Sequence, residues 1–410
     1  MPILNRIAAF HADMTAWRHD LHQHPELGFQ EHRTSALVAE KLRQFGCDEV
    51  VTGVARTGVV GAIRGRTGGG AIGLRADMDA LPIVEETGLP YASATPGVMH
   101  ACGHDGHTTM LLGAARYLAE TRNFPGTVYV IFQPAEEGLA GGALMVKEGL
   151  FERFPMDMVF GLHNWPTEPA GAFRWGTGPI MAATASFEIT VHGRGGHAAH
   201  PNDTIDPIVA AAEIVTALQT VVARNVPPAE PAVVSVGHIS GGHTHNVIPS
   251  TVRMLGTTRW FAPAVGDLLE SGVRRTATGI AESLGARAEV SYLRNYIATV
   301  NDEAATALTV RAAAAVAGEA HVVPMRRPTM GAEDFSFMLA AKQGSYIMLG
   351  SARGADEPKL HHPRYDFNDA ILPVGASYWA TLAEQVLAEQ GPGGQGPGGQ
   401  GPGGQASQGA

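Results

Sequence analysis

The densest group of reactive side chains is the segment HACGHDGH at residues 100–107. Cys102 and His104 stand two positions apart in a glycine-containing loop before a predicted helix, so a thiolate and an imidazole could face the same cation. Asp105 could cap that helix or steady a ligand. The competing interpretation is a small buried cysteine beside ordinary loop histidines, and this segment alone leaves both interpretations open.

Two adjacent acids, Glu136 and Glu137, follow an apolar run at 128–132. Such a pair often does no more than begin a solvated helix. A two-metal hydrolase, however, needs one carboxylate that binds metal and a second, unbound one that takes a proton from the attacking water. Because a loop does not impose the alternation of a strand, both glutamates could point into one site and divide these roles.

His163 and His361 complete the candidate set, each placed shortly after a predicted strand. A single histidine is more often structural than a ligand. One thiolate, three imidazoles and one carboxylate at one edge of a sheet indicate a metal site much more strongly than any one of them. Imidazole suits zinc, cobalt, nickel or manganese, whereas thiolate favours the softer ions.

The elements that must position these side chains are short apolar runs separated by helical patterns. The runs lie at 71–75, 128–132, 158–162 and 345–349, and the clearest helical pattern spans 108–119. Buried strands that alternate with helices predict an α/β fold with a mostly parallel sheet and helices on both faces. Ligands bind beyond the carboxyl ends of such strands, where the candidate residues would gather.

The middle of the chain has a different order of elements. Between 183 and 295 the patterns read strand, helix, strand, strand, helix, strand, which predicts an inserted α+β ferredoxin-like domain. Residues 1–182 and 296–390 would then form the catalytic metal-binding domain. Residues 391–410 begin with repeats of Gly-Pro-Gly-Gly-Gln and predict a disordered tail, because they have nothing to bury.

Composition narrows the function classes. The 410 residues are 45% hydrophobic and 17% charged, which favours a well-buried globular enzyme. A formal charge of −10 argues against nucleic acid or an anionic membrane as partner. The two cysteines exclude a disulfide framework, and we find neither a secretory signal nor a run approaching the ~20 apolar residues of a membrane span. We therefore expect a cytoplasmic protein.

The chain resembles the dinuclear-metal amidohydrolases and metallopeptidases that include aminoacylases, carboxypeptidase G-like enzymes and hippurate hydrolases. It is most similar to the branch of hippurate hydrolases and indoleacetyl-amino-acid hydrolases. The motifs that carry the resemblance occur in the order of the family between about residues 15 and 370. They include LRADMDALP at 74–82, HACGHDGHT at 100–108, FQPAEEG at 132–138, GRGGHAAHP at 193–201, GAEDF at 331–335 and LHHPRYDFND at 360–369.

The resemblance implies roles for individual residues of the catalytic domain. Two divalent ions per subunit (zinc, manganese, cobalt or nickel) would bind to Cys102, His104, Glu137, His163 and His361, with Cys102 as the bridge. Glu136 would be the general base, and Asp79 would orient a ligand. His361 is chosen over His362 because the family pattern is His, any residue, Pro.

The resemblance also makes the inserted domain a lid. His197 would approach on closure and stabilise the oxyanion of the tetrahedral intermediate. Asn246 and Arg259 would hold the free carboxylate of the substrate, although Arg259 by itself could be a surface charge at a strand end. Four further histidines stay unassigned: His200, His238, His243 and His245.

The predicted function is a metal-dependent amidohydrolase that cleaves small N-acyl amino acids, hippurate-like or N-acetylated, to a carboxylic acid and a free amino acid. The alternatives are a dipeptidase, a carboxypeptidase or an N-carbamoyl amino acid hydrolase with the same site, or a non-catalytic protein that binds metal or ligand. The resemblance further implies a dimer or tetramer formed through the lid domain.

Overall fold

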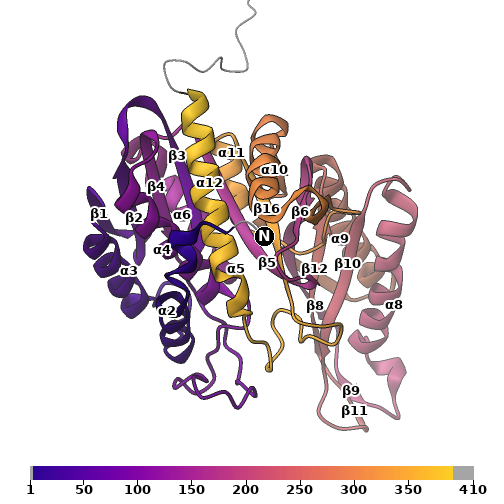
Figure 1. The fold of residues 1–410 in the computed structure, drawn as a ribbon. Coiled ribbons are helices and arrows are strands. Elements are labelled where there is room, and N and C mark those ends of the chain that lie inside the picture. The colour runs from indigo at the N-terminus through magenta and orange to yellow at the C-terminus, as the bar shows by residue number, and fades with distance from the viewer. Residues whose placement is uncertain (1–2, 391–410) are drawn as a thin grey trace, which may run out of the picture.

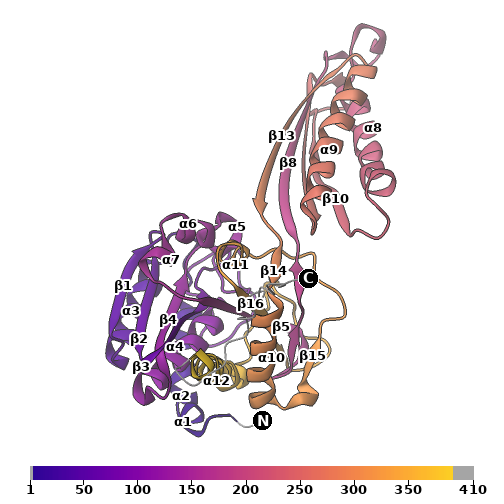
Figure 2. The same ribbon diagram turned by 90° about the horizontal axis from the view of Figure 1, so that it is seen from above.

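The computed structural model describes residues 3–390, and the predicted tail at 391–410 lies outside them. Its two main sheets have eight and four strands. Figure 1 shows the two sheets side by side, and Figure 2 shows the smaller one, with its helices, extending away from the larger. We call the part of the chain around the smaller sheet the lid.

The eight-stranded sheet has a parallel centre and antiparallel flanks. The central strands β4, β3, β5 and β16 run parallel to one another. On the flanks, β1 pairs antiparallel with β2, β2 with β4, and β6 with β16. In spatial order the strands are β1 (Glu49–Val54), β2 (Gly58–Arg64), β4 (Pro125–Gln133), β3 (Arg66–Asp77), β5 (Met158–Pro169), β16 (Gly344–Ala352), β6 (Phe173–Trp175) and β15 (Val322–Pro324).

Helices cover both faces of this sheet. Along β4, Val128 and Val130 enter one hydrophobic core, while Ile131 enters the core on the opposite face, as the alternation of a strand requires. The first core is completed by α1 (Asn5–Ala8), α2 (His11–Gln23), α3 (His32–Phe45), α4 (His104–Thr121), α10 (Glu303–Ala317) and α12 (Leu372–Gln390). The second is completed by α6 (Gly141–Lys147), α7 (Leu150–Arg153) and α11 (Phe335–Ala341). The predicted α/β class is confirmed.

The lid has the predicted ferredoxin-like order. Its elements are β8 (Ala183–His192), α8 (Pro207–Thr220), β10 (Ala232–Ser240), β12 (Thr251–Trp260), α9 (Pro263–Ser283) and β13 (Arg287–Tyr296). The strands lie antiparallel in the order β10-β12-β8-β13, and both helices pack on them around a core of their own. Asp206 begins α8 by accepting a hydrogen bond from the backbone N–H of Ile208 at 2.8 Å, with Pro207 as the first helical residue.

One helical segment of the lid departs from the composition analysis. Pro207–Asn225, which joins α8 to the π-helical turn Val221–Asn225, is long and apolar enough to span a membrane by length and composition. The expectation that no segment would qualify is therefore wrong by this criterion. Ala210, Ala211, Ile214 and Leu218 of this helix are buried in the lid core, and one helix that meets this criterion is weak evidence for a membrane span.

Candidate active site

The predicted catalytic residues gather at the carboxyl ends of the central strands. Asp79 follows β3, Glu136 and Glu137 follow β4, and His361 lies in the loop after β16. His163 differs from the prediction, since it lies within β5 and not after it. The pairing of β5 with β16, which sets His163 opposite Met348, extends the strand to Pro169. The side chain still faces the same site.

Cys102, His104 and His163 form one group of potential metal ligands. Their ligand atoms lie within 4.8 Å of one another, and all three residues are buried. Cys102 Sγ lies 3.4 Å from His163 Nε2. The loop turns sharply at Gly103, whose φ is 93° and where an added Cβ would lie 2.4 Å from Asn164 Oδ1. Only glycine fits there, and α4 begins directly afterwards with His104.

A second group consists of Cys102, Glu137 and His361, again with ligand atoms within 4.8 Å. His361 Nε2 lies 3.1 Å from Glu137 Oε1. The backbone of His361 has a φ of 67° and donates its N–H to the carbonyl of Ala101 at 2.7 Å, which ties this loop to the cysteine. Cys102 belongs to both groups, so the arrangement suits two cations that share one thiolate.

Hydrogen bonds fix the orientation of the two buried histidines. His104 Nδ1 lies 2.9 Å from the carbonyl oxygen of Asp79, and His163 Nδ1 lies 2.7 Å from that of Asn164. In each ring the bonded nitrogen therefore leaves Nε2 for a ligand-binding role. His104 Nε2 and Glu137 Oε1 are buried and form no hydrogen bond within residues 3–390, because the approach of His361 Nε2 to Glu137 Oε1 lacks hydrogen-bond geometry. Buried polar atoms are normally satisfied, so these two atoms fit a metal ion.

The electrostatics of the site also fit a cation. Burial raises the pKa of the Cys102 thiol well above its usual value, and the carboxylates of Glu137 and Glu136 add to the rise. Burial lowers the pKa of His163 well below its usual range, so this imidazole is neutral and can donate its lone pair. A thiol surrounded by carboxylates becomes a thiolate ligand only when a cation supplies the compensating charge.

Glu136 is a buried acid beside the ligand groups. It is 6% exposed, and its carboxylate lies within 4.8 Å of those of Glu333 and Asp334. Burial raises the pKa of Glu136 well above its usual value, and the charges of Glu333 and Glu137 raise it further. A carboxylate with a raised proton affinity is suited to accept and return a proton.

Asp79 connects the two ligand-bearing segments. Its Oδ2 accepts the backbone N–H of Glu137 at 2.9 Å, and its Oδ1 lies 3.2 Å from His104 Nδ1. One carboxylate therefore contacts both the helix start at His104 and the turn that carries Glu137.

A buried network beneath the ligands was missed by the sequence analysis. His107 Nδ1 lies 2.6 Å from Asp77 Oδ1, and Arg75 donates to Asp77 Oδ2 at 2.7 Å and to Glu333 Oε1 at 2.8 Å. Asn164 Oδ1 lies 2.7 Å from His107 Nε2. All five side chains are buried. The available sign was the presence of Arg75 and Asp77 in an otherwise apolar strand, because buried charges require partners.

Of the three lid residues predicted to act in the site, Arg259 lines the site cavity, whereas His197 and Asn246 do not. Arg259 lines a cavity of about 440 Å³ together with four of the proposed ligands: Cys102, Glu137, His163 and His361. Of the described residues, neither His197 nor Asn246 lines this cavity. His197 lies in β9 (Gly196–His197), paired with β11 (Val247–Ile248), which begins directly after Asn246. Figure 1 shows β9 and β11 together at one end of the lid.

A model of the Peptidase family M20/M25/M40 matches residues 73–385, a span that contains both ligand groups, Glu136 and the lid. The chain belongs to this family. The resemblance predicted from the motifs is therefore confirmed at the level of the family.

The similarity to known proteins extends over nearly the whole chain. The hippurate hydrolase of Campylobacter jejuni is 42% identical over 94% of this chain and 100% of that protein. The N-acetylcysteine deacetylase of Bacillus subtilis is 40% identical over 92% of this chain and 98% of that protein. A solved structure of a dinuclear metal-binding M20 peptidase of Bacillus subtilis matches with a TM-score of 0.79 at 36% identity, covering 93% of this chain and 99% of that chain.

Proposed function

We propose that the chain is a metal-dependent amidohydrolase that cleaves small N-acyl amino acids, hippurate-like or N-acetylated, to a carboxylic acid and a free amino acid. The observation that carries this proposal is that Cys102 belongs to two ligand groups while a further buried carboxylate, Glu136, lies within 4.8 Å of the ligand atoms of His104 and Glu137. Similarity to a hippurate hydrolase and an N-acetylcysteine deacetylase supports the substrate class.

Five residues would hold two divalent ions: Cys102, His104, Glu137, His163 and His361. When bound, such ions supply Lewis acidity and lower the pKa of water. The mixed set of one thiolate, imidazoles and a carboxylate accommodates zinc, manganese, cobalt or nickel. Similarity to a dinuclear metal-binding peptidase supports the number of ions. Asp79 keeps His104 and Glu137 in place through its contacts with both.

Glu136 moves the proton of the reaction. It takes a proton from the attacking water, whose oxygen forms a bond to the amide carbon. As the bond between carbon and nitrogen breaks, Glu136 returns the proton to the leaving amine, which is the free amino acid. The enclosed position of Glu136 keeps bulk water from competing for this proton.

The lid supplies the contacts that distinguish the substrate. Arg259 lines the same cavity as the ligands, and its planar guanidinium suits the free carboxylate of an N-acyl amino acid. Asn246 would join it, and His197 would stabilise the developing oxyanion, when the lid closes. A dimer or tetramer formed through the lid and a cytoplasmic location stay predictions.

A substrate panel tests this proposal. We would measure amino-acid release from hippurate, N-acetylmethionine, an indoleacetyl-amino acid, a dipeptide and an N-carbamoyl amino acid, with chelated protein refilled separately with zinc, manganese, cobalt or nickel. Preferred release from the acyl-amino acids, lost on chelation and restored by metal, is expected. Preference for the dipeptide or the carbamoyl compound would favour the alternative hydrolases, and binding of two ions with no turnover would favour a binding protein.

A further inference from the structure

The turn that carries the two glutamates has an unusual backbone. α5 (Glu136–Leu139) lies between Ala135, with φ of 55°, and Ala140, with φ of 57°. Residues with a Cβ adopt this left-handed conformation rarely, and they keep it only where the surrounding structure holds them. Ala135 is held by its backbone N–H, which donates to Glu31 Oε1 at 2.8 Å. The other end of the turn needs a partner of its own.

That partner is Tyr296, the last residue of the lid strand β13. Its hydroxyl donates to the carbonyl oxygen of Glu136 and accepts the backbone N–H of Ala140 at 3.3 Å. The tyrosine is buried, with 7% of its surface exposed. One phenol therefore binds both ends of the turn that bears the general base.

The course of β13 explains how a lid residue reaches this turn. Arg294 pairs with Ala185 and Tyr296 pairs with Thr184, so Asn295 is an extra residue and the register shifts. A bulge of this kind redirects the side chain that follows it. Thr184 is also paired with Arg259 of β12. Arg259, which is proposed to bind the substrate carboxylate, and Tyr296 thus lie on either side of Thr184 in three adjacent lid strands. All three residues line the site cavity.

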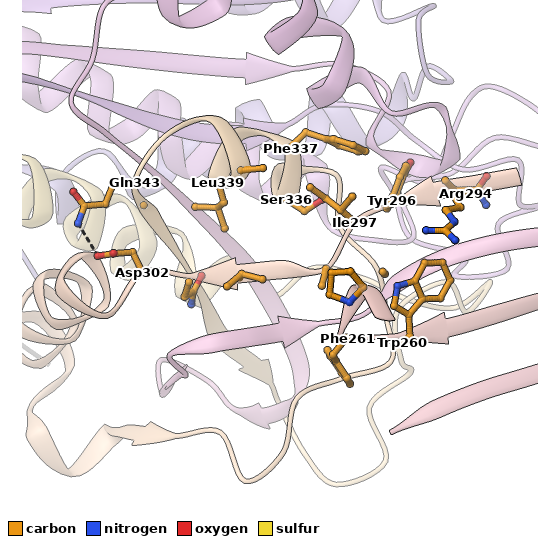
Figure 3. Close-up of a pocket in the computed structure, with 18 of the residues that line it drawn as sticks. Trp260, Phe261, Arg294, Tyr296, Ile297, Asp302, Ser336, Phe337, Leu339 and Gln343 are labelled. Atoms are coloured by element: carbon orange, nitrogen blue, oxygen red, sulfur yellow. Dashed lines mark hydrogen bonds between the residues drawn. The ribbon is translucent and has the colours of Figure 1, made fainter. Parts of the chain in front are cut away.

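Tyr296 also lies at the junction between the lid and the larger sheet. A second cavity of about 980 Å³ lies there, lined by Trp260 and Phe261 of the lid and by Phe337 and Leu339 of α11 (Figure 3). Tyr296 lines both this cavity and that of the site, and its ring meets Phe337 edge-on, with 6.2 Å between the centroids. Tyr296 therefore borders the cavity between the lid and α11 on one side and contacts the Glu136 turn on the other. A change in the position of the lid could reach Glu136 through this residue.

We propose that Tyr296 is a positioning residue that holds the Glu136 turn in its catalytic conformation and connects this turn to the end of the lid strand β13. This inference rests on the proposed role of Glu136 as general base. Tyr296 acts through the backbone of the turn, so its loss should change the rate of the chemical step more than substrate binding.

The test compares Tyr296→Phe with a matched control in the same strand, Tyr292→Phe. Tyr292 also makes a phenolic hydrogen bond, 2.6 Å from Thr258 Oγ1, but its ring stacks on Phe187 inside the lid. With metal-loaded protein and an acyl-amino acid, Tyr296→Phe should lower kcat roughly ten- to a hundredfold, since small misplacements of catalytic groups have effects of this size. KM and metal content should stay near wild type, and Tyr292→Phe should keep the wild-type kcat.

A third variant separates positioning from general damage. Ala140→Gly removes the Cβ that disfavours a positive φ, so the turn should need the tyrosine less. The double variant Tyr296→Phe/Ala140→Gly should regain part of the lost kcat. Wild-type kcat in Tyr296→Phe, an equal loss in Tyr292→Phe, or a loss explained by missing metal would each overturn the role of Tyr296. An inactive wild-type protein on every substrate would instead overturn the proposed function itself.

Discussion

The two halves of the proposed site are built in opposite ways. On the larger sheet, His104, His163 and Glu136 are buried, and hydrogen bonds fix the two rings. On the lid, His197 and Asn246 are exposed, and within residues 3–390 their side-chain hydrogen bonds are to near neighbours in the chain: Ala199 N–H at 3.0 Å and Thr244 Oγ1 at 3.0 Å. The residues of the larger sheet are preorganised for chemistry, and Arg259 of the lid already lines their cavity, whereas His197 and Asn246 could act only after a movement.

The sharpest test of the preorganised half is removal of its base. Glu136→Ala should lower kcat by about 10³- to 10⁴-fold, the upper range for loss of a general acid–base group, because water would then lack its proton acceptor. Elemental analysis should find metal content near wild type, because Glu136 is not a proposed ligand. Activity equal to wild type would remove Glu136 from the mechanism.

The network beneath the ligands should be needed for stability as well. Arg75→Met leaves Asp77, Glu333 and Asp334 buried without their shared cation, so the free energy of unfolding should fall by about 3–5 kcal/mol in a urea titration. Arg253→Met, which breaks an exposed pair with Glu188 on the lid, is the matched control and should change stability little. Equal effects of the two variants would refute the contrast between the halves.

A buried histidine behind the site predicts a pH dependence. Burial lowers the pKa of His22, but hydrogen bonds to Asp105 and Glu85 outweigh it and raise the pKa to about 9, from 6.5. Because the folded-state pKa is raised, the stabilisation is complete below pH 6.5 and is lost as the pH rises through about 9. It is on the order of 3 kcal/mol. Unfolding of wild type and His22→Gln, compared at pH 6 and pH 9.5, should show the larger difference at pH 6; a constant difference would contradict the prediction.

The exposed lid histidine predicts a loss of rate without a loss of stability. His197→Ala should lower kcat by about a hundredfold, the effect of losing one oxyanion donor. The melting temperature should not change, because the side chain is exposed and packs on little. His200→Ala is the matched control, since its ring lies 5.4 Å from that of His197 and has no assigned role. An unchanged rate in His197→Ala would exclude the lid histidine from the reaction.

The sequence predicted the fold and family well because both depend on local patterns. Apolar runs ending in reactive residues predicted the parallel centre of the sheet, and the motifs predicted the family. The sequence could not predict the hydrogen bonds between Arg75 and Glu333 or between Tyr296 and Glu136. The residues of each pair are far apart in the chain, and only tertiary packing brings them together. The distance between His197 and the metal ligands depends on how the lid is placed relative to the larger sheet. The hydrophobic pattern of the sequence does not predict this placement. The domain boundaries at 183 and 295 stay predictions.

The most direct test of the central claim is to count the metal ions while following turnover. Chelated protein would be titrated with zinc or manganese, and metal per chain and hydrolysis of an N-acyl amino acid would be measured at each step. In the wild-type protein we expect no activity without metal and the binding of up to two ions per chain. In Cys102→Ala we expect low activity and fewer than two bound ions. Full activity in the chelated protein, or two tightly bound ions in Cys102→Ala, would contradict a catalytic site built around a shared thiolate.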